Sequence, residues 1–196
     1  MPTNKQSNKQ SQSMNLLTSS DSQDWYTPLK YIEAVRETFG GVIDLDPASC
    51  AEANETVNAT RFYSKEGFDN GLTQLWSGKV FCNPPYGKTN GKSNQGLFSD
   101  KLCYEYQAGR VKEAILLVNL YPGYSWFAPL RDKPRCELDH RIAFVSPNDN
   151  DDGNNKGKEK EEAKASSVFI YFGIDPTKFY TVFSRFGFCG QLKRYL

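Results

Sequence analysis

Apolar residues in this chain gather in short runs that polar segments separate. The run 114–118 is apolar throughout, as expected of a strand that is covered on both faces of a sheet. Shorter runs of the same kind, bounded by Gly, Pro, Asn or Asp, predict further strands. The predicted strands are residues 42–45, 61–63, 80–82, 114–118, 141–145, 168–172 and 180–186. We expect the last two to form an antiparallel hairpin at one end of the sheet.

Helical periodicity is clearest in residues 28–39. The apolar residues of this segment are spaced for one helix face, and Gly40-Gly41 follows as a stop signal. Thr27 is the expected N-cap, with Pro28 in the first helical position. Two further helices are predicted at residues 49–58 and 97–108.

Strands that alternate with helices at this spacing predict a layered α/β fold. We assign residues 23–196 to a single domain and residues 1–22, rich in Ser, Asn, Gln and Lys, to a disordered tail. Residues 147–165 form a low-complexity insert, expected to be a solvated loop, with a flap that contacts DNA or a partner as the alternative. Residues 87–96 are expected to be a mobile loop.

Composition narrows the possible functions. The 196 residues carry a net charge of +1, which argues against a histone-like DNA binder. The five cysteines include no Cys-x-x-Cys pair, which favours free thiols in a reducing compartment over a zinc site. His140 has no Cys or Asp partner at ligand spacing, so we expect it at a strand edge. No apolar run has membrane-spanning length. We expect a cytoplasmic monomer with no metal and no membrane partner.

The segment Asn83-Pro84-Pro85-Tyr86 follows the predicted strand 80–82. An exocyclic amino group of a nucleobase is a poor nucleophile, because its lone pair is delocalised into the ring. The Asn83 side-chain oxygen and the Pro84 carbonyl offer two acceptors in a rigid loop, suited to hold both N–H bonds of such an amine. Tyr86 offers a flat face on which a base can stack. On their own, the four residues are better explained as a sharp turn after a core strand.

Upstream motifs change that balance. Asp46-Pro47-Ala48 ends the first predicted strand, and Asp69 lies in a loop before strand 80–82. Ligands of open α/β sheets bind outside the carboxyl ends of the strands, so we expect these residues and Asn83 on one rim of the sheet. The alternative for each aspartate is a helix cap or a turn.

The ordered combination of motifs resembles the amino-methyltransferases that use S-adenosylmethionine, most closely the small, often phage-encoded DNA N6-adenine methyltransferases of the Dam type. The resemblance spans about residues 24–187. It rests on the motifs Asp24-Trp25-Tyr26-Thr27-Pro28, Asp44-Leu45-Asp46-Pro47-Ala48, residues 69–76, and Phe81-Cys82-Asn83-Pro84-Pro85-Tyr86-Gly87. It implies a Rossmann-like methyltransferase sheet, mostly parallel with an antiparallel C-terminal hairpin. It also implies double-stranded DNA as the substrate and S-adenosylmethionine as the cofactor.

The resemblance also implies roles for individual residues. The Asp46 carboxylate would face the methionine ammonium of the cofactor, Asp69 would read its adenine amino group, and Glu66 is the nearest candidate for the ribose hydroxyls. The residues implied in cofactor binding are Tyr26, Thr27, Pro28, Asp44, Asp46, Pro47, Ala48, Asp69 and Asn83. The residues implied in catalysis are Asn83, Pro84, Pro85 and Tyr86.

Asn-Pro-Pro-Tyr alone identifies the reaction better than the substrate. Cytosine N4 in DNA, guanine N2 in RNA and a glutamine side chain are alternative acceptors, and an inert DNA-binding phage protein is the non-enzymatic alternative. Two groups of basic residues are candidates for phosphate contacts, with ordinary solvated charge as the alternative. They are Lys88 and Lys92, and Arg131, Lys133 and Arg135.

Overall fold

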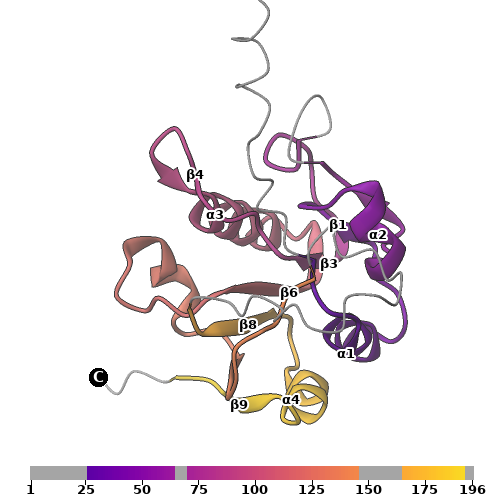
Figure 1. The fold of residues 1–196 in the computed structure, drawn as a ribbon, viewed down its shortest axis with the longest axis vertical. Coiled ribbons are helices and arrows are strands. Elements are labelled where there is room, and N and C mark those ends of the chain that lie inside the picture. Colours follow the sequence, from indigo (N-terminus) through magenta and orange to yellow (C-terminus); the bar gives the residue numbers. More distant parts are fainter. Residues whose placement is uncertain (1–25, 65–69, 146–164, 193–196) are drawn as a thin grey trace, which may run out of the picture.

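The computed structural model describes residues 26–64, 70–145 and 165–192. In these ranges seven strands form one sheet, in the order β2-β1-β3-β6-β8-β7-β9 (Figure 1). A separate hairpin, β4-β5, projects from the body. The strands of the sheet are β1 (Leu45–Asp46), β2 (Arg61–Phe62), β3 (Gly78–Cys82), β6 (Val111–Asn119), β7 (Arg135–Leu138), β8 (Ser167–Phe172) and β9 (Gly187–Gly190). Those of the hairpin are β4 (Lys88–Thr89) and β5 (Lys92–Ser93).

The sheet has a parallel half and an antiparallel half. Strands β2, β1, β3 and β6 run parallel. Strand β8 pairs antiparallel with β6 and β7, and β9 pairs antiparallel with β7. The predicted α/β methyltransferase sheet, with its antiparallel C-terminal part, is confirmed.

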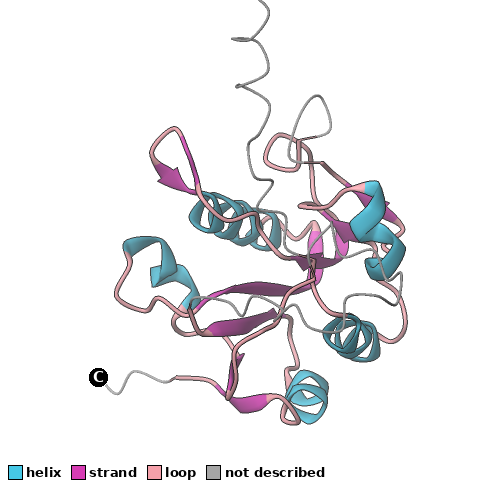
Figure 2. Ribbon diagram, in the orientation of Figure 1, coloured by secondary structure: helices cyan, strands magenta, loops and turns pink. Residues whose placement is uncertain are grey.

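Helices cover both faces of this sheet (Figure 2). Helix α3 links β3 to β6 as a βαβ crossover and shares one face with the 3-10 helix η2. Helices α1, α2 and α4 contribute to the core on the other face. Their bounds are α1 (Leu29–Phe39), α2 (Ala51–Val57), α3 (Asn94–Gln107), η2 (Ser125–Leu130) and α4 (Thr177–Phe183).

Strand β6 shows why the sequence forms layers. Ile115 and Leu117 pack toward α1 and α4, whereas Leu116 and Val118 pack toward α3. All four are at most 2% exposed, because side chains alternate between two covered faces. Burying each of these side chains stabilises the fold by about 1.5–3 kcal/mol.

Two predicted strands are wrong. Most of residues 180–186 belongs to α4, in which Phe179, Val182 and Phe183 recur at helical spacing and are buried. Residues 141–145 form no strand, and Val145 meets Tyr26 only through an isolated antiparallel bridge. The predicted strand 168–172 is confirmed as β8, but its antiparallel neighbours are β6 and β7, so the predicted hairpin with residues 180–186 does not form.

Other boundaries also differ from prediction. Pro28, not Thr27, is the N-cap of α1, and it makes no side-chain capping bond. Residues 87–96 contain hairpin β4-β5 and the start of α3 rather than only a loop. The positive φ of Asn90 and Gly91, 51° and 77°, forms the tight turn of that hairpin. The predicted tail 1–22 and nearly all of the insert 147–165 lie outside the described residues.

Candidate active site at the carboxyl ends of the parallel strands

Three neighbouring parallel strands end at one edge of the sheet. Strand β1 pairs with β3, and Cys82 at the end of β3 pairs with Leu116 of β6. The segments that leave these strands therefore share a rim, where open α/β sheets bind ligands. These segments are residues 47–48 after β1, 83–86 after β3 and 120–125 after β6.

Asn83 is tied to the segment that precedes α1. Its side-chain Nδ2 donates a hydrogen bond to the Thr27 hydroxyl, with 3.1 Å between the atoms. Thr27 is only 5% exposed, so this hydrogen bond is shielded from solvent. Because Nδ2 faces Thr27, the amide oxygen of Asn83 is turned the other way. The structure thus joins two motifs that lie 56 positions apart.

Asp46 is a buried carboxylate at the end of β1. It is 3% exposed and accepts a hydrogen bond from the Ala48 backbone N–H at 3.1 Å. Burial raises its pKa to about 7, against the opposing effect of hydrogen bonds from Ala48 and Ser49. Within the described ranges no cation forms an ion pair with it. A carboxylate in this setting is suited to a cationic ligand.

Tyr86 closes the loop after β3. Its half-buried ring packs edge-on against Phe144, with 6.1 Å between ring centroids. Its pKa is raised to about 12, first by burial and second by the nearby Tyr121, so the phenol stays neutral at physiological pH. Asn94, the first residue of α3, donates from Nδ2 to the Tyr86 carbonyl at 3.1 Å. Asn94 also accepts a hydrogen bond from Thr89 at 2.7 Å, which connects this loop to hairpin β4-β5.

The turn after β1 is packed against the loop that leads to β3. A Cβ on Gly71 would lie 1.9 Å from the Pro47 carbonyl oxygen, so only glycine fits there. The indole of Trp76 donates to the Gly71 carbonyl at 2.7 Å and fixes this approach. Asp69 and Glu66 lie outside the described residues, and their cofactor contacts stay predictions.

Two residues predicted to bind a cofactor have protein partners. The Asp44 carboxylate accepts a hydrogen bond at 2.7 Å from the Lys79 backbone N–H, near the start of β3 and away from the rim. The Tyr26 hydroxyl donates to Glu52 at 3.1 Å. Both cofactor contacts stay predictions.

A family model for DNA N-6-adenine-methyltransferase (Dam) matches residues 13–185. The chain belongs to this family. It is therefore a DNA N6-adenine methyltransferase by family, and the rim just described is its candidate active site. A search of curated proteins finds no match. The phage origin suggested by the sequence stays a prediction.

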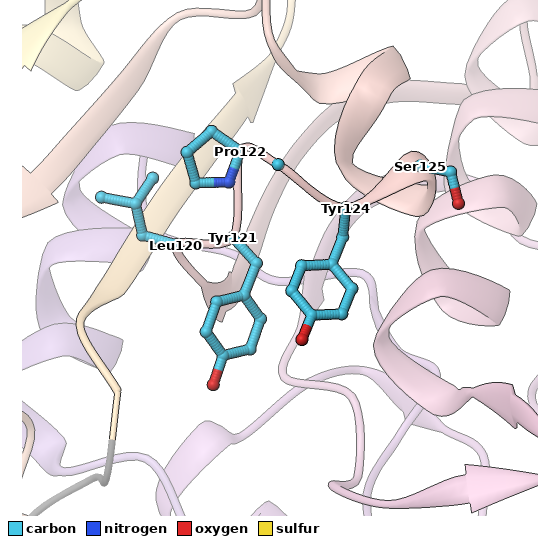
Figure 3. A pocket seen from close by; sticks show the side chains of 6 residues that line it. Leu120, Tyr121, Pro122, Tyr124 and Ser125 are labelled. Carbon is cyan, nitrogen blue, oxygen red and sulfur yellow. The ribbon is translucent and has the colours of Figure 1, made fainter.

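A third segment of the rim, which was not predicted as part of the site, follows β6 in this Dam-family chain. Tyr121 and Tyr124 follow β6, 37% and 59% exposed, with ring centroids 5.1 Å apart (Figure 3). With Leu120 and Pro122 they line a hollow of about 520 Å³. The signal was present, because residues 114–118 had been predicted as a strand and the loop after it belongs to the same edge.

Most of the basic residues proposed for phosphate contacts have structural partners in this Dam-family chain. Arg135 is buried and pairs with Glu137 at 2.9 Å. Lys133 lies over the rings of Tyr106 and Phe172. Arg131 also has a structural partner. Its guanidinium Nε donates to the Pro122 carbonyl at 3.0 Å, in the loop after β6.

The structure also shows the surroundings of His140 and the cysteines, and it bears on metal sites and membrane-spanning helices. His140 lies 2.6 Å from the Tyr31 hydroxyl and 2.6 Å from the Asp139 carboxylate. All five cysteines are free thiols. Among the described residues no three His, Cys, Asp or Glu side chains are grouped to hold a metal ion. No helix in the same ranges has the length and apolar character to cross a membrane.

Proposed function

We propose that this protein transfers a methyl group from S-adenosylmethionine to N6 of adenine in double-stranded DNA. The observation that carries the proposal is the Asn83–Thr27 hydrogen bond on the rim that also holds the buried Asp46. The buried Asp46 carboxylate suits the positive ammonium group of the cofactor. The oriented Asn83 amide suits the positive charge that develops on the target amine during methyl transfer. Family membership supplies DNA adenine as the acceptor.

Asp46 supports the cofactor assignment. The methionine part of S-adenosylmethionine carries an ammonium group, and a buried carboxylate gains most from such a partner. The cofactor would supply an electrophilic methyl group. Pro47 and Ala48 would contact the bound cofactor beside Asp46. Thr27-Pro28 would contact it from the side of α1. Asp69, Tyr26 and Asp44 complete the set that we propose.

The target amine would be held by the loop after β3. Asn83 Oδ1 and the Pro84 carbonyl would accept its two N–H bonds, so that the lone pair turns toward the methyl donor. Both acceptors are preorganised, because Pro84 and Pro85 restrict the backbone and Thr27 fixes the amide. Tyr86 would stack on the adenine after it leaves the duplex. The surplus proton passes to solvent after transfer, so no side chain with a tuned pKa is required.

Methyl transfer to unmethylated double-stranded DNA tests the proposal. We expect label from methyl-labelled S-adenosylmethionine in N6-methyldeoxyadenosine, after digestion and nucleoside analysis. Asn83→Ala is the matched control and should lose the label while it keeps the fold by circular dichroism. Label in N4-methyldeoxycytidine, in RNA or in protein would overturn the substrate assignment, and failure to bind the cofactor in calorimetry would overturn the enzymatic one.

A further inference from the structure

The loop after β6 carries two exposed aromatic rings next to the target-base site. Tyr121 and Tyr124 lie 5.1 Å apart between centroids, with planes inclined by 35°. Figure 3 shows the rings side by side with both hydroxyls pointing the same way. Strand β6 is the parallel neighbour of β3, so this loop leaves the sheet beside the loop that holds Tyr86. Tyr121 is also near enough to raise the pKa of Tyr86.

Contacts of the backbone hold the loop in place. The Tyr124 backbone N–H donates to the Tyr121 carbonyl at 3.0 Å, which closes a four-residue turn. Pro122 restricts the backbone at the second position of this turn. Arg131 Nε donates a hydrogen bond to the Pro122 carbonyl at 3.0 Å. The turn is therefore closed by backbone contacts, and the two exposed rings are available to a ligand on a preorganised loop.

A cation next to an aromatic pair fits a nucleotide. The rings suit the flat face of a base, and the Arg131 guanidinium offers positive charge for a phosphate beside it. The nucleotides that flank the target adenine are only one phosphate link from it, so they come near the adjacent rim segment when the adenine is flipped toward Tyr86. On this ground, and resting on the proposed DNA methylation, we propose that Tyr121 and Tyr124 form a stacking platform for the nucleotide next to the target adenine.

The platform is a binding element and not part of the methyl transfer itself. Tyr121→Ala/Tyr124→Ala should raise the KM for a DNA duplex and its Kd by about 10-fold or more, since one base–aromatic stack contributes on that order. The kcat at saturating DNA and the calorimetric Kd for S-adenosylmethionine should change by less than about threefold. Tyr121→Phe/Tyr124→Phe should restore DNA affinity, because stacking requires the ring and not the hydroxyl.

Tyr104→Ala is the matched control. Tyr104 is 61% exposed on α3, away from the rim, and its loss should leave the KM for DNA unchanged. A second readout uses 2-aminopurine placed next to the target adenine in a site identified by sequencing methylated DNA. Its fluorescence relative to the free duplex should differ between the wild-type complex and the complex of the double alanine variant, because only the wild type exchanges stacking in the duplex for stacking on tyrosine.

The two proposals can fail separately. Equal duplex Kd values in fluorescence anisotropy for wild type and the double alanine variant, or unchanged 2-aminopurine fluorescence, would overturn the platform while methylation continues. A fall in kcat with no change in DNA affinity would also overturn it. Absence of N6-methyladenine with the wild-type protein would overturn the proposed function, and anisotropy would still decide whether the tyrosines bind DNA.

Discussion

The Asn83 side chain donates a hydrogen bond to the Thr27 hydroxyl at 3.1 Å, and so the segment before α1 sets the orientation of the amide after β3. An amide that is free to rotate presents oxygen or nitrogen to a ligand with similar ease. In the structure the buried Thr27 hydroxyl accepts the Nδ2 proton, and this orientation leaves the amide oxygen on the opposite side. The conformation of one motif therefore depends on another that is distant in the sequence.

Thr27→Val tests this dependence. Valine keeps the branched shape and removes the acceptor, so Asn83 loses its fixed orientation. We expect kcat for DNA methylation to fall by about 3- to 10-fold, the effect of one ordinary hydrogen bond, with little change in the KM for DNA. Thr27→Ser retains the hydroxyl and should recover most of the rate. If valine and serine variants lose activity equally, shape rather than hydrogen bonding explains the role of Thr27.

Tyr86 is expected to act through its ring. Its pKa, raised to about 12 by burial, keeps the hydroxyl protonated throughout the usual assay range, so the phenol offers no base. Tyr86→Phe should retain kcat/KM within about threefold, and Tyr86→Ala should lower it by about 10-fold or more through lost stacking. Steady-state kinetics from pH 6 to about 10 should show the same profile for wild type and Tyr86→Phe. A large loss with phenylalanine would contradict this assignment.

Some elements could be predicted from local pattern and others could not. Strand β6 was predicted correctly, because burial on both faces leaves a continuous apolar run. Residues 180–186 were assigned to a strand because Tyr, Phe and Val favour strands, whereas in the fold their apolar positions pack as one face of α4. Local pattern cannot decide between these outcomes when tertiary packing selects one of them.

The site shows the same division. The rim positions of Asp46 and Asn83 followed from the rule that ligands bind at the carboxyl ends of parallel strands. Thr27 was assigned to a helix cap, because a threonine before a proline fits that pattern and its true partner is 56 residues away. Tyr121 was overlooked, although the same rule applied to the strand before it.

Asp46 should make cofactor binding depend on pH. Its pKa is raised to about 7 by burial, so below pH 7 the carboxyl is protonated and offers no charge to an ammonium. The calorimetric Kd for S-adenosylmethionine should be about 10-fold higher at pH 6 than at pH 8, with proton release on binding below pH 7. Asp46→Asn should bind weakly and without this pH dependence, and Asp100→Asn, an exposed control on α3, should behave as wild type. A wild-type Kd independent of pH would contradict the assignment.

The same raised pKa predicts the sign of a stability change. Between 3.8 and about 7 the folded protein holds the Asp46 proton more tightly than the unfolded chain. The contribution of Asp46 to the free energy of unfolding should therefore fall as pH rises through that window. The difference between wild type and Asp46→Asn, measured by urea unfolding without cofactor, isolates this contribution. A difference that grows in favour of wild type with rising pH would contradict the prediction.

Two features make Gly78 hard to replace: its positive φ and the Asp44 carboxylate beside it. Its φ is +78°, and a Cβ there would lie 2.4 Å from Asp44 Oδ2, which accepts the Lys79 N–H. Gly91 has nearly the same φ, +77°, but a Cβ there would have nothing within 4 Å. Substitution of Gly91 therefore measures the backbone strain alone, without a steric clash. We expect Gly91→Ala to lower the free energy of unfolding by about 1 kcal/mol and Gly78→Ala by about 1–3 kcal/mol more. Urea unfolding measures both, and equal losses would show that Asp44 moves aside without cost.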